Sequence, residues 1–109
     1  MINHAIKNIN YQIYRNNSFT QFAFPNTIVQ QIINIQNEYL NWEVLGYSYQ
    51  NRPISMLKIG DGETKILLWS QMHGDEPTAT AAMFDVINFI NSQEYLAKKI
   101  KRELSIYFI

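Results

Sequence analysis

The chain of 109 residues contains no cysteine. This absence excludes disulfide bridges, thiolate metal sites and cysteine nucleophiles together, although it does not identify the compartment. A dominant charge of one sign is also lacking, because nine Lys and Arg residues balance nine Asp and Glu residues. Without a basic or acidic field, we expect no nucleic-acid partner and no attraction to an anionic membrane.

Long hydrophobic runs are missing as well. No apolar stretch approaches the roughly 20 residues that a transmembrane helix requires. The first residues have neither an apolar segment nor a small-residue cleavage pattern, so we expect no signal peptide in this chain. Hydrophobic residues nevertheless make up 47% of the sequence and aromatic residues 14%, which is enough for a packed core. We therefore expect a soluble domain, or part of one.

The first part of the chain is divided into an irregular segment and a helix. Residues 1–24 show no regular hydrophobic period, and we expect an irregular lead-in there. Residues 25–109 are then taken as one domain, which opens with a helix at Pro25-Asn26-Thr27. The apolar stripe expected on this helix consists of Ile28, Ile32, Ile35 and Tyr39, widened by Val29 and Ile33. We expect the stripe to pack against a sheet.

Three strands are predicted where the hydrophobic period changes to two. The first covers residues 42–49 and the second residues 53–59, with a turn at Gln50-Asn51 between them. The segment at residues 60–63, Gly-Asp-Gly-Glu, is typical of a hairpin turn. The third strand begins at Lys65, and its Ile-Leu-Leu-Trp run favours a central strand covered on both faces.

A helix and a last strand complete the predicted elements. Pro77 is typical of the first helical position, with either Asp75 or Glu76 as the N-cap. The stripe expected to be buried consists of Ala79, Met83, Val86, Ile87 and Ile90, with Ala81 and Ala82 allowing close approach to a sheet. A helical piece over residues 93–101 leads to a strand over residues 104–109, and this strand–helix–strand order implies parallel pairing. The chain stops within that apolar strand, so we expect an incomplete domain.

The segment His73-Gly74-Asp75-Glu76 lies between the apolar third strand and the helix. Imidazole nitrogen and carboxylate oxygen are good zinc ligands, and catalytic zinc sites combine three protein ligands with a water. Zinc lowers the pKa of that water and polarises a substrate carbonyl. Gly74 is expected to allow a sharp turn, and the helix N-terminus favours a negative charge on Glu76. The pattern indicates His73 and Glu76 as two ligands of a hydrolytic metal site.

A purely structural interpretation of these residues stays open. In that interpretation Asp75 and Glu76 only cap the helix, and His73 is a loop residue without a ligand. His4, the other histidine, lies in the lead-in and is expected at the surface.

Residues 46–60, GYSYQNRPISMLKIG, followed by the HGDE segment, resemble the N-terminal part of M14 zinc carboxypeptidases. In that family a Gly-x-Ser-x-x-Gly-Arg-Pro-Ile type strand pair precedes a strand that ends in a His-x-x-Glu zinc motif. The resemblance covers about residues 40–109 and implies an α/β fold with a mixed, mostly parallel sheet flanked by helices. It also implies that His73 and Glu76 are the first two ligands of one Zn2+ ion, in an enzyme that hydrolyses a peptide substrate.

The chain departs from the family pattern in what it lacks. No histidine follows His73, so the third zinc ligand is expected outside this chain, and so are the general-base glutamate and the residues that hold the substrate carboxylate. Asn51 stands where a glycine is usual, although Asn tolerates turn geometry. Arg52 is interpreted as a strand-start residue and not as a carboxylate clamp. We expect the N-terminal part of a catalytic domain, with no assigned catalytic or substrate-binding residue and no activity alone.

Two other functions remain as alternatives. Zinc-dependent deacylases of the aspartoacylase or succinylglutamate desuccinylase type also use a His-Gly-x-Glu motif, but the Arg-Pro-Ile strand pair argues against them. The other alternative is a non-catalytic α/β remnant, in which the residues between the third strand and the helix have only a structural role.

Overall fold

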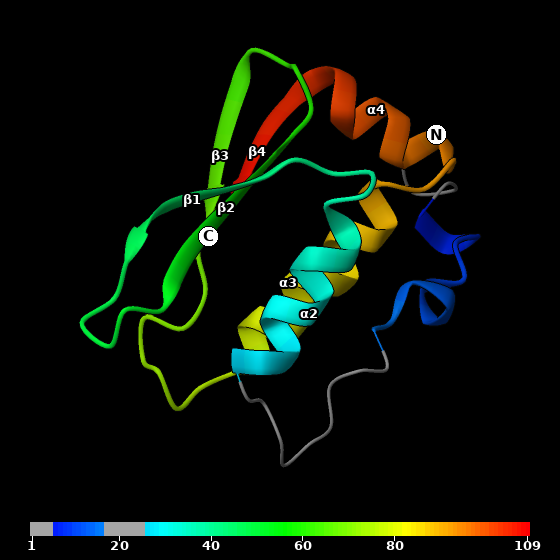
Figure 1. The fold of residues 1–109 in the computed structure, drawn as a ribbon. Helices are drawn as coiled ribbons and strands as arrows, with labels where there is room; N and C mark the ends of the chain where they lie inside the picture. Colours follow the sequence, from blue (N-terminus) through cyan, green and yellow to red (C-terminus); the bar gives the residue numbers. More distant parts are fainter. Residues whose placement is uncertain (1–5, 17–25) are drawn as a thin grey trace.

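The computed structural model describes residues 6–16 and 26–109. Figure 1 shows helices packed beside one sheet. In chain order the elements are the 3₁₀ helix η1 (Tyr11–Tyr14), α2 (Asn26–Gln36), β1 (Trp42–Tyr47), β2 (Pro53–Ile59), β3 (Thr64–Leu68), α3 (Thr78–Ile90), α4 (Tyr95–Glu103) and β4 (Leu104–Phe108). The predictions for His4 and Pro25 concern residues outside the described ranges.

The described strands form one sheet in the order β1-β2-β4-β3. β1 pairs with β2 and β2 pairs with β4 in the antiparallel sense, whereas β3 and β4 are parallel. The helices α3 and α4 connect the parallel pair, as the strand–helix–strand order predicts. The mixed α/β fold with helices flanking the sheet is therefore confirmed. Among the described strands the parallel pairing is limited to β3 and β4. The short turn between β1 and β2 permits only antiparallel pairing of those two strands.

The hairpin predicted at residues 60–63 is wrong. The chain reverses direction there, but it does so across the start of β4, so β2 and β3 are not paired with each other. The Asp61 amide donates to the Lys101 carbonyl at 2.9 Å, and the Gly62 amide donates to the Leu104 carbonyl at 3.2 Å. The backbones meet so closely that a β-carbon on Gly62 would overlap the chain between α4 and β4. The segment therefore needs glycine for close backbone approach.

The third predicted strand occupies a different position from the one expected. β3 lies at the end of the described sheet with β4 as its one described neighbour, whereas the sequence predicts a central strand. Leu67 and Leu68 are 55% and 37% exposed, so the strand is not covered on both faces. A continuous apolar run indicates a strand that can be buried, but it does not specify the order of strands in a sheet.

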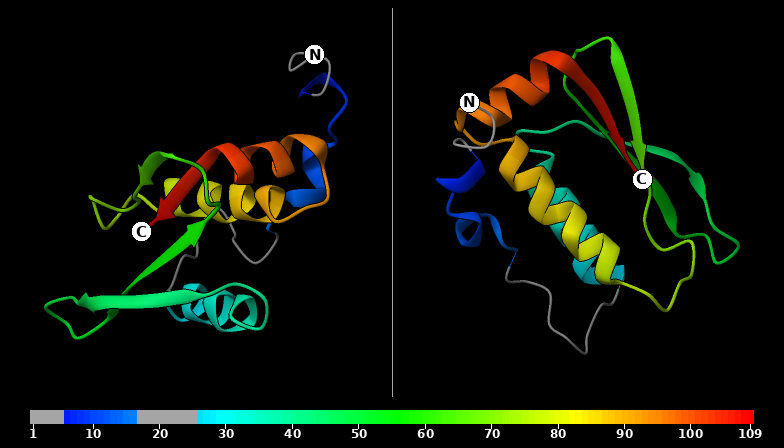
Figure 2. Two further views of the ribbon diagram at one scale, coloured as in Figure 1. Left: turned by 90° about the horizontal axis from the view of Figure 1, so that it is seen from above. Right: turned by 180° about the vertical axis from the view of Figure 1, so that it is seen from behind.

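The hydrophobic core lies where α2 and α3 face β2 and β4. α2 and α3 overlap in Figure 1, and the view from above in Figure 2 shows them at separate levels. The buried apolar cluster consists of Ile32, Ile33, Leu57, Ile59, Phe84, Ile87, Ile90, Ile106 and Phe108. In β2 the buried Leu57 and Ile59 alternate with the exposed Lys58, which is the period of two expected for a strand.

The buried stripe of α2 differs in part from the predicted one. Ile32 and Ile33 are buried, and Ile28 and Val29 pack against them. Ile35 is 62% exposed, and Tyr39 lies beyond the helix end and is 56% exposed, so these two predictions are wrong. Gln36 faces the core instead, because its Oε1 accepts a 2.9 Å hydrogen bond from Trp42 Nε1. The hydrophobic period of the sequence does not predict the burial of a polar amide that has a hydrogen-bond partner.

The stripe of α3 is also shifted. Ile87 and Ile90 are buried as predicted, and Met83 packs against the core. Ala79 and Val86 are exposed, so these predictions are wrong. The buried positions that the prediction missed are Thr80 and Phe84. Within the two described ranges, no helix has the length and apolar character needed to cross a bilayer.

Candidate metal centre

The predicted metal ligands lie in the loop that joins β3 to α3, residues 69–77, here named the β3–α3 loop (Figure 1). The loop leaves the sheet beside the end of β4. There the Ser70 amide donates a 2.8 Å hydrogen bond to the Ile109 carbonyl, and the Ile109 amide donates to the Leu68 carbonyl at 2.9 Å. The start of the loop is therefore tied to the parallel strand pair.

His73 and Glu76 face each other within this loop. His73 Nδ1 lies 3.3 Å from Glu76 Oε2. A backbone turn supports the contact, because the Glu76 amide donates to the His73 carbonyl at 3.1 Å. The two side chains are 67% and 71% exposed, so a metal ion can reach them from solvent. The spacing of three residues thus brings an imidazole and a carboxylate to one point.

The backbone turn of the loop does not depend on Gly74. A β-carbon added to Gly74 would have no atom within 4 Å, and its φ is not positive. The expectation that Gly74 supplies a special turn conformation is therefore wrong. Gln71 has the left-handed conformation instead, with φ 52°. Residue type does not predict this conformation, since Gln is not a residue that favours positive φ.

The helix after the loop starts one residue later than predicted. α3 begins at Thr78, and Pro77 occupies the N-cap position. The predictions of Pro77 as the first helical residue and of Asp75 or Glu76 as the N-cap are therefore wrong. Pro77 already has helical dihedral angles, and its carbonyl accepts from the Ala81 amide at 3.1 Å, so a proline still opens the helix.

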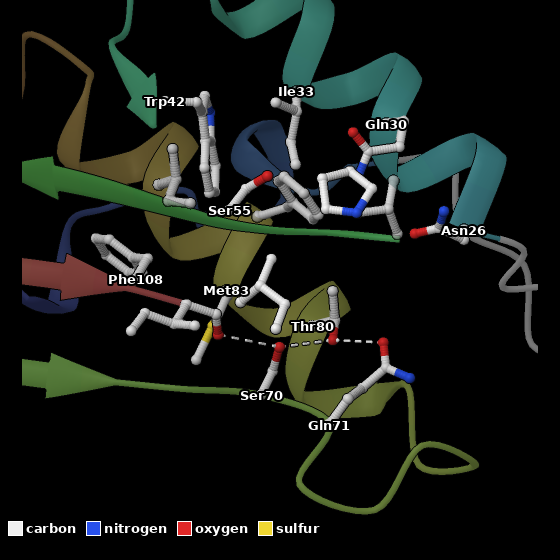
Figure 3. A pocket seen from close by; sticks show the side chains of 16 residues that line it. Asn26, Gln30, Ile33, Trp42, Ser55, Ser70, Gln71, Thr80, Met83 and Phe108 are labelled. Carbon is white, nitrogen blue, oxygen red and sulfur yellow. Dashed lines mark hydrogen bonds between the residues drawn. The ribbon is translucent and has the colours of Figure 1, made fainter. Parts of the chain in front are cut away.

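A chain of polar side chains connects the loop to the first turn of α3 (Figure 3). The Thr80 hydroxyl lies 2.8 Å from Ser70 Oγ and 3.1 Å from Gln71 Oε1. The other end of the Gln71 amide donates from Nε2 to the Gly74 carbonyl at 2.9 Å. Sequence reasoning missed Ser70, Gln71 and Thr80, because their contacts join residues of a strand end, a loop and a helix.

An open cavity of about 660 Å³ lies in front of the His73–Glu76 pair. Asp75 also lines it, together with the apolar side chains of Trp69 and Met72. Trp69 is 54% exposed and Met72 is 68% exposed. The pair is therefore accessible from a space large enough to receive part of another molecule.

The model of the zinc carboxypeptidase family, Peptidase M14, matches residues 28–109, from α2 to the end of β4. The chain belongs to the zinc carboxypeptidase family. No curated protein matches it. The matched region includes both the β1–β2 pair and the β3–α3 loop, which carry the resemblance seen in the sequence.

The separation of the pair is close to that of two neighbouring zinc ligands. Zinc binds His nitrogen and carboxylate oxygen at about 2.0–2.2 Å, so two tetrahedral ligands lie about 3.4 Å apart. The observed separation between His73 Nδ1 and Glu76 Oε2 is 3.3 Å. In the described part of the chain, no group of three or more His, Cys, Asp or Glu side chains is placed to hold a metal. The described residues thus offer two donor side chains, one fewer than a catalytic zinc site uses.

Proposed function

We propose that this chain is the N-terminal part of the catalytic domain of a zinc-dependent metallocarboxypeptidase, with His73 and Glu76 as two ligands of the ion. The observation that supports this proposal is the 3.3 Å separation of their donor atoms in a loop open to solvent. The family to which the chain belongs is named for zinc, and a carboxypeptidase acts on a peptide. The substrate is therefore a peptide.

Each residue of the pair has a defined task in this proposal. His73 presents Nδ1 and Glu76 presents Oε2, and the carboxylate offsets part of the positive charge at the site. The hydrogen bond from the Glu76 amide to the His73 carbonyl holds both side chains on one turn. Zinc, when bound, supplies Lewis-acid polarisation of the scissile carbonyl and activation of a water molecule. The cavity lined by Trp69 and Met72 receives the part of the peptide nearest the ion.

A third protein ligand and a general base lie outside this chain in our proposal. The chain alone therefore binds zinc weakly, because a catalytic site needs three protein ligands. It also does not hydrolyse peptides. Weak zinc binding is thus assigned to the residues of this chain, and peptide hydrolysis to the complete site.

Zinc titration of the chain tests the assignment of the two ligands. We expect a saturable shift of the backbone amide resonances of the β3–α3 loop in an NMR titration with Zn2+, and its loss in His73→Ala and in Glu76→Gln. His4→Ala provides a matched control, because His4 is the other histidine of the sequence. We expect His4→Ala to bind zinc like the wild type.

The opposite pattern of results would reject the ligand assignment. Zinc binding that survives in both His73→Ala and Glu76→Gln would show that the pair has only a structural role. Chelator-sensitive cleavage of a peptide by the chain alone would show that the site is already complete. Cleavage of an N-acyl amino acid, with peptides left intact, would favour the deacylase alternative.

A further inference from the structure

Gln71 lies two residues before His73 in an unfavourable backbone conformation. Its φ of 52° is in the left-handed region, which costs free energy for any residue with a β-carbon. Such a conformation persists only where the surroundings hold it in place. The two ends of the Gln71 side-chain amide provide the contacts that do so.

The Gln71 amide spans the loop between the two proposed ligands. Its Nε2 donates to the Gly74 carbonyl at 2.9 Å, and Gly74 lies in the chain between His73 and Glu76. His73 and Glu76 are both largely exposed, and among the described residues their side-chain hydrogen bond is the one they make with each other. Contact with the protein interior therefore does not fix their position. The backbone of the loop has to fix it, and the Gln71 amide holds that backbone at its midpoint.

The second end of the amide is fixed by a buried hydroxyl. Gln71 Oε1 lies 3.1 Å from Thr80 Oγ1, and Thr80 is 8% exposed in the first turn of α3. Thr80 Oγ1 also lies 2.8 Å from Ser70 Oγ, and the Ser70 amide is bonded to the Ile109 carbonyl at 2.8 Å. This chain of contacts, drawn in Figure 3, connects the loop to both the helix and the sheet.

On the side away from His73 and Glu76, these contacts border an apolar cavity. Ser70, Gln71 and Thr80 line a cavity of about 210 Å³ under the loop, and none of its 16 lining residues is ionisable. Most of the wall is apolar, with Trp42, Phe84 and Phe108 among its residues. The contact between Thr80 Oγ1 and Gln71 Oε1 is partly buried, so water competes with it less than with the exposed bond from Gln71 Nε2 to the Gly74 carbonyl.

We propose that Gln71 and Thr80 form a clamp that positions His73 and Glu76 for the metal. They are positioning residues, because neither touches the ion, and the proposal rests on the zinc site proposed above. Groups that orient metal ligands typically change metal affinity by about 10-fold to 100-fold when they are removed. The clamp therefore contributes to zinc affinity through the conformation of the loop.

The test compares zinc affinity with stability in three variants. Gln71→Gly removes the side chain but accepts a φ of 52° without strain, so we expect zinc affinity to fall by about tenfold while the thermal midpoint is maintained or rises. Thr80→Val removes the hydroxyl at nearly constant volume and is expected to weaken zinc binding by a similar factor. Thr80→Ser keeps the hydroxyl and is expected to stay within about twofold of the wild type. Zn2+ affinity is measured by the same NMR titration of the loop amide resonances, and circular dichroism records the thermal midpoint.

Matched controls and a double variant complete the experiment. Thr64→Val and Gln93→Ala change the same residue types at exposed positions and should leave zinc affinity unchanged. The double variant Gln71→Gly with Thr80→Val should bind zinc no more weakly than whichever single variant binds zinc less tightly, because both changes break one connected unit. If Thr80→Val fails to fold, Gln71→Gly carries the test.

Failure of the clamp and failure of the metal site give different results. If Gln71→Gly and Thr80→Val bind zinc within about twofold of the wild type while His73→Ala does not bind, the clamp is wrong and the ligand assignment stands. If His73→Ala binds zinc like the wild type, the ligand assignment is wrong and the clamp has no metal site to position. A loss of affinity that parallels a loss of stability in Gln71→Gly would also reject the clamp.

Discussion

In the described part of the chain, the ion pairs join residues no more than four positions apart, and Glu103 provides the clearest case. Lys99 donates a 2.6 Å hydrogen bond from Nζ to Glu103 Oε1 one turn away on α4. This hydrogen bond is the largest of the effects that hold the pKa of Glu103 below its ordinary value, and the positive charges of Lys99 and Arg102 act in the same direction. Exposed pairs of this kind contribute little to stability, because water and salt screen them.

The Glu103 pair gives a prediction with a definite sign. Because its pKa is lower in the folded chain, its contribution to stability is present above the unfolded pKa and is lost as pH falls through the folded pKa. We expect Lys99→Ala to move the Glu103 titration, followed by NMR of its carboxyl carbon, to higher pH. Lys98→Ala is the control and should not move it. An unchanged Glu103 titration in Lys99→Ala would show that the ion pair does not persist in solution.

The candidate site also shows how far single residues can be predicted. His73 and Glu76 could be selected from the sequence, because a spacing of three at a strand–helix junction places two side chains on one turn. Gln71 and Thr80 could not, because their roles depend on the distance between the loop and the first turn of α3. Asn51 is an intermediate case. Its φ of 58° agrees with the tolerance of Asn for turn geometry.

Secondary-structure elements followed the local pattern wherever that pattern was strong. β2 covers the predicted residues, and β4 and α4 lie within a few residues of the predicted ranges. Connections between elements were harder to predict from the sequence than the elements themselves, and residues 60–63 are the clearest example. The Asp-Gly pair is typical of a hairpin, yet the segment passes over the start of β4. Local turn chemistry could not reveal that another strand occupies the space between β2 and β3.

The crossing predicts that two glycines differ in their tolerance of alanine. Gly62→Ala places a β-carbon against the backbone between Glu103 and Leu104, so we expect the free energy of unfolding to fall by more than about 1 kcal/mol. Gly46 in β1 has open space around it, and Gly46→Ala should change stability by no more than about 0.5 kcal/mol. Urea denaturation measures both values. Equal losses in the two variants would contradict the close approach at Gly62.

At the scale of the whole molecule, one core unites α2, β2, α3 and β4. Leu57 and Phe108 are each 1% exposed, although they come from distant parts of the sequence. They are brought together by the pairing of Leu57 with Phe108 in neighbouring antiparallel strands. On its other edge β4 pairs with β3, so the core and the base of the β3–α3 loop share the strand β4.

The core predicts unequal effects for the same substitution in the two long helices. Ile87 is 1% exposed, so Ile87→Val should lower the free energy of unfolding by about 0.5–1.5 kcal/mol. Ile35 is 62% exposed, so Ile35→Val is a matched control that should change stability by less than about 0.5 kcal/mol. Thermal or urea unfolding of the two variants provides the comparison. A larger loss in Ile35→Val would show that the originally predicted stripe of α2, and not the observed one, faces the core.

The sequence by itself determined the properties that depend on neighbours along the chain. These are the alternation of β2, the helical periods, the parallel β3–β4 unit and the approach of His73 to Glu76. Only the tertiary structure decided that β4 separates β2 from β3, that β3 ends the described sheet, and that Gln71 and Thr80 hold the loop. The physical reason is the range of the interactions involved. Hydrophobic period and backbone turns act over a few residues, whereas strand order and hydrogen bonds between elements depend on contacts that the sequence does not place side by side.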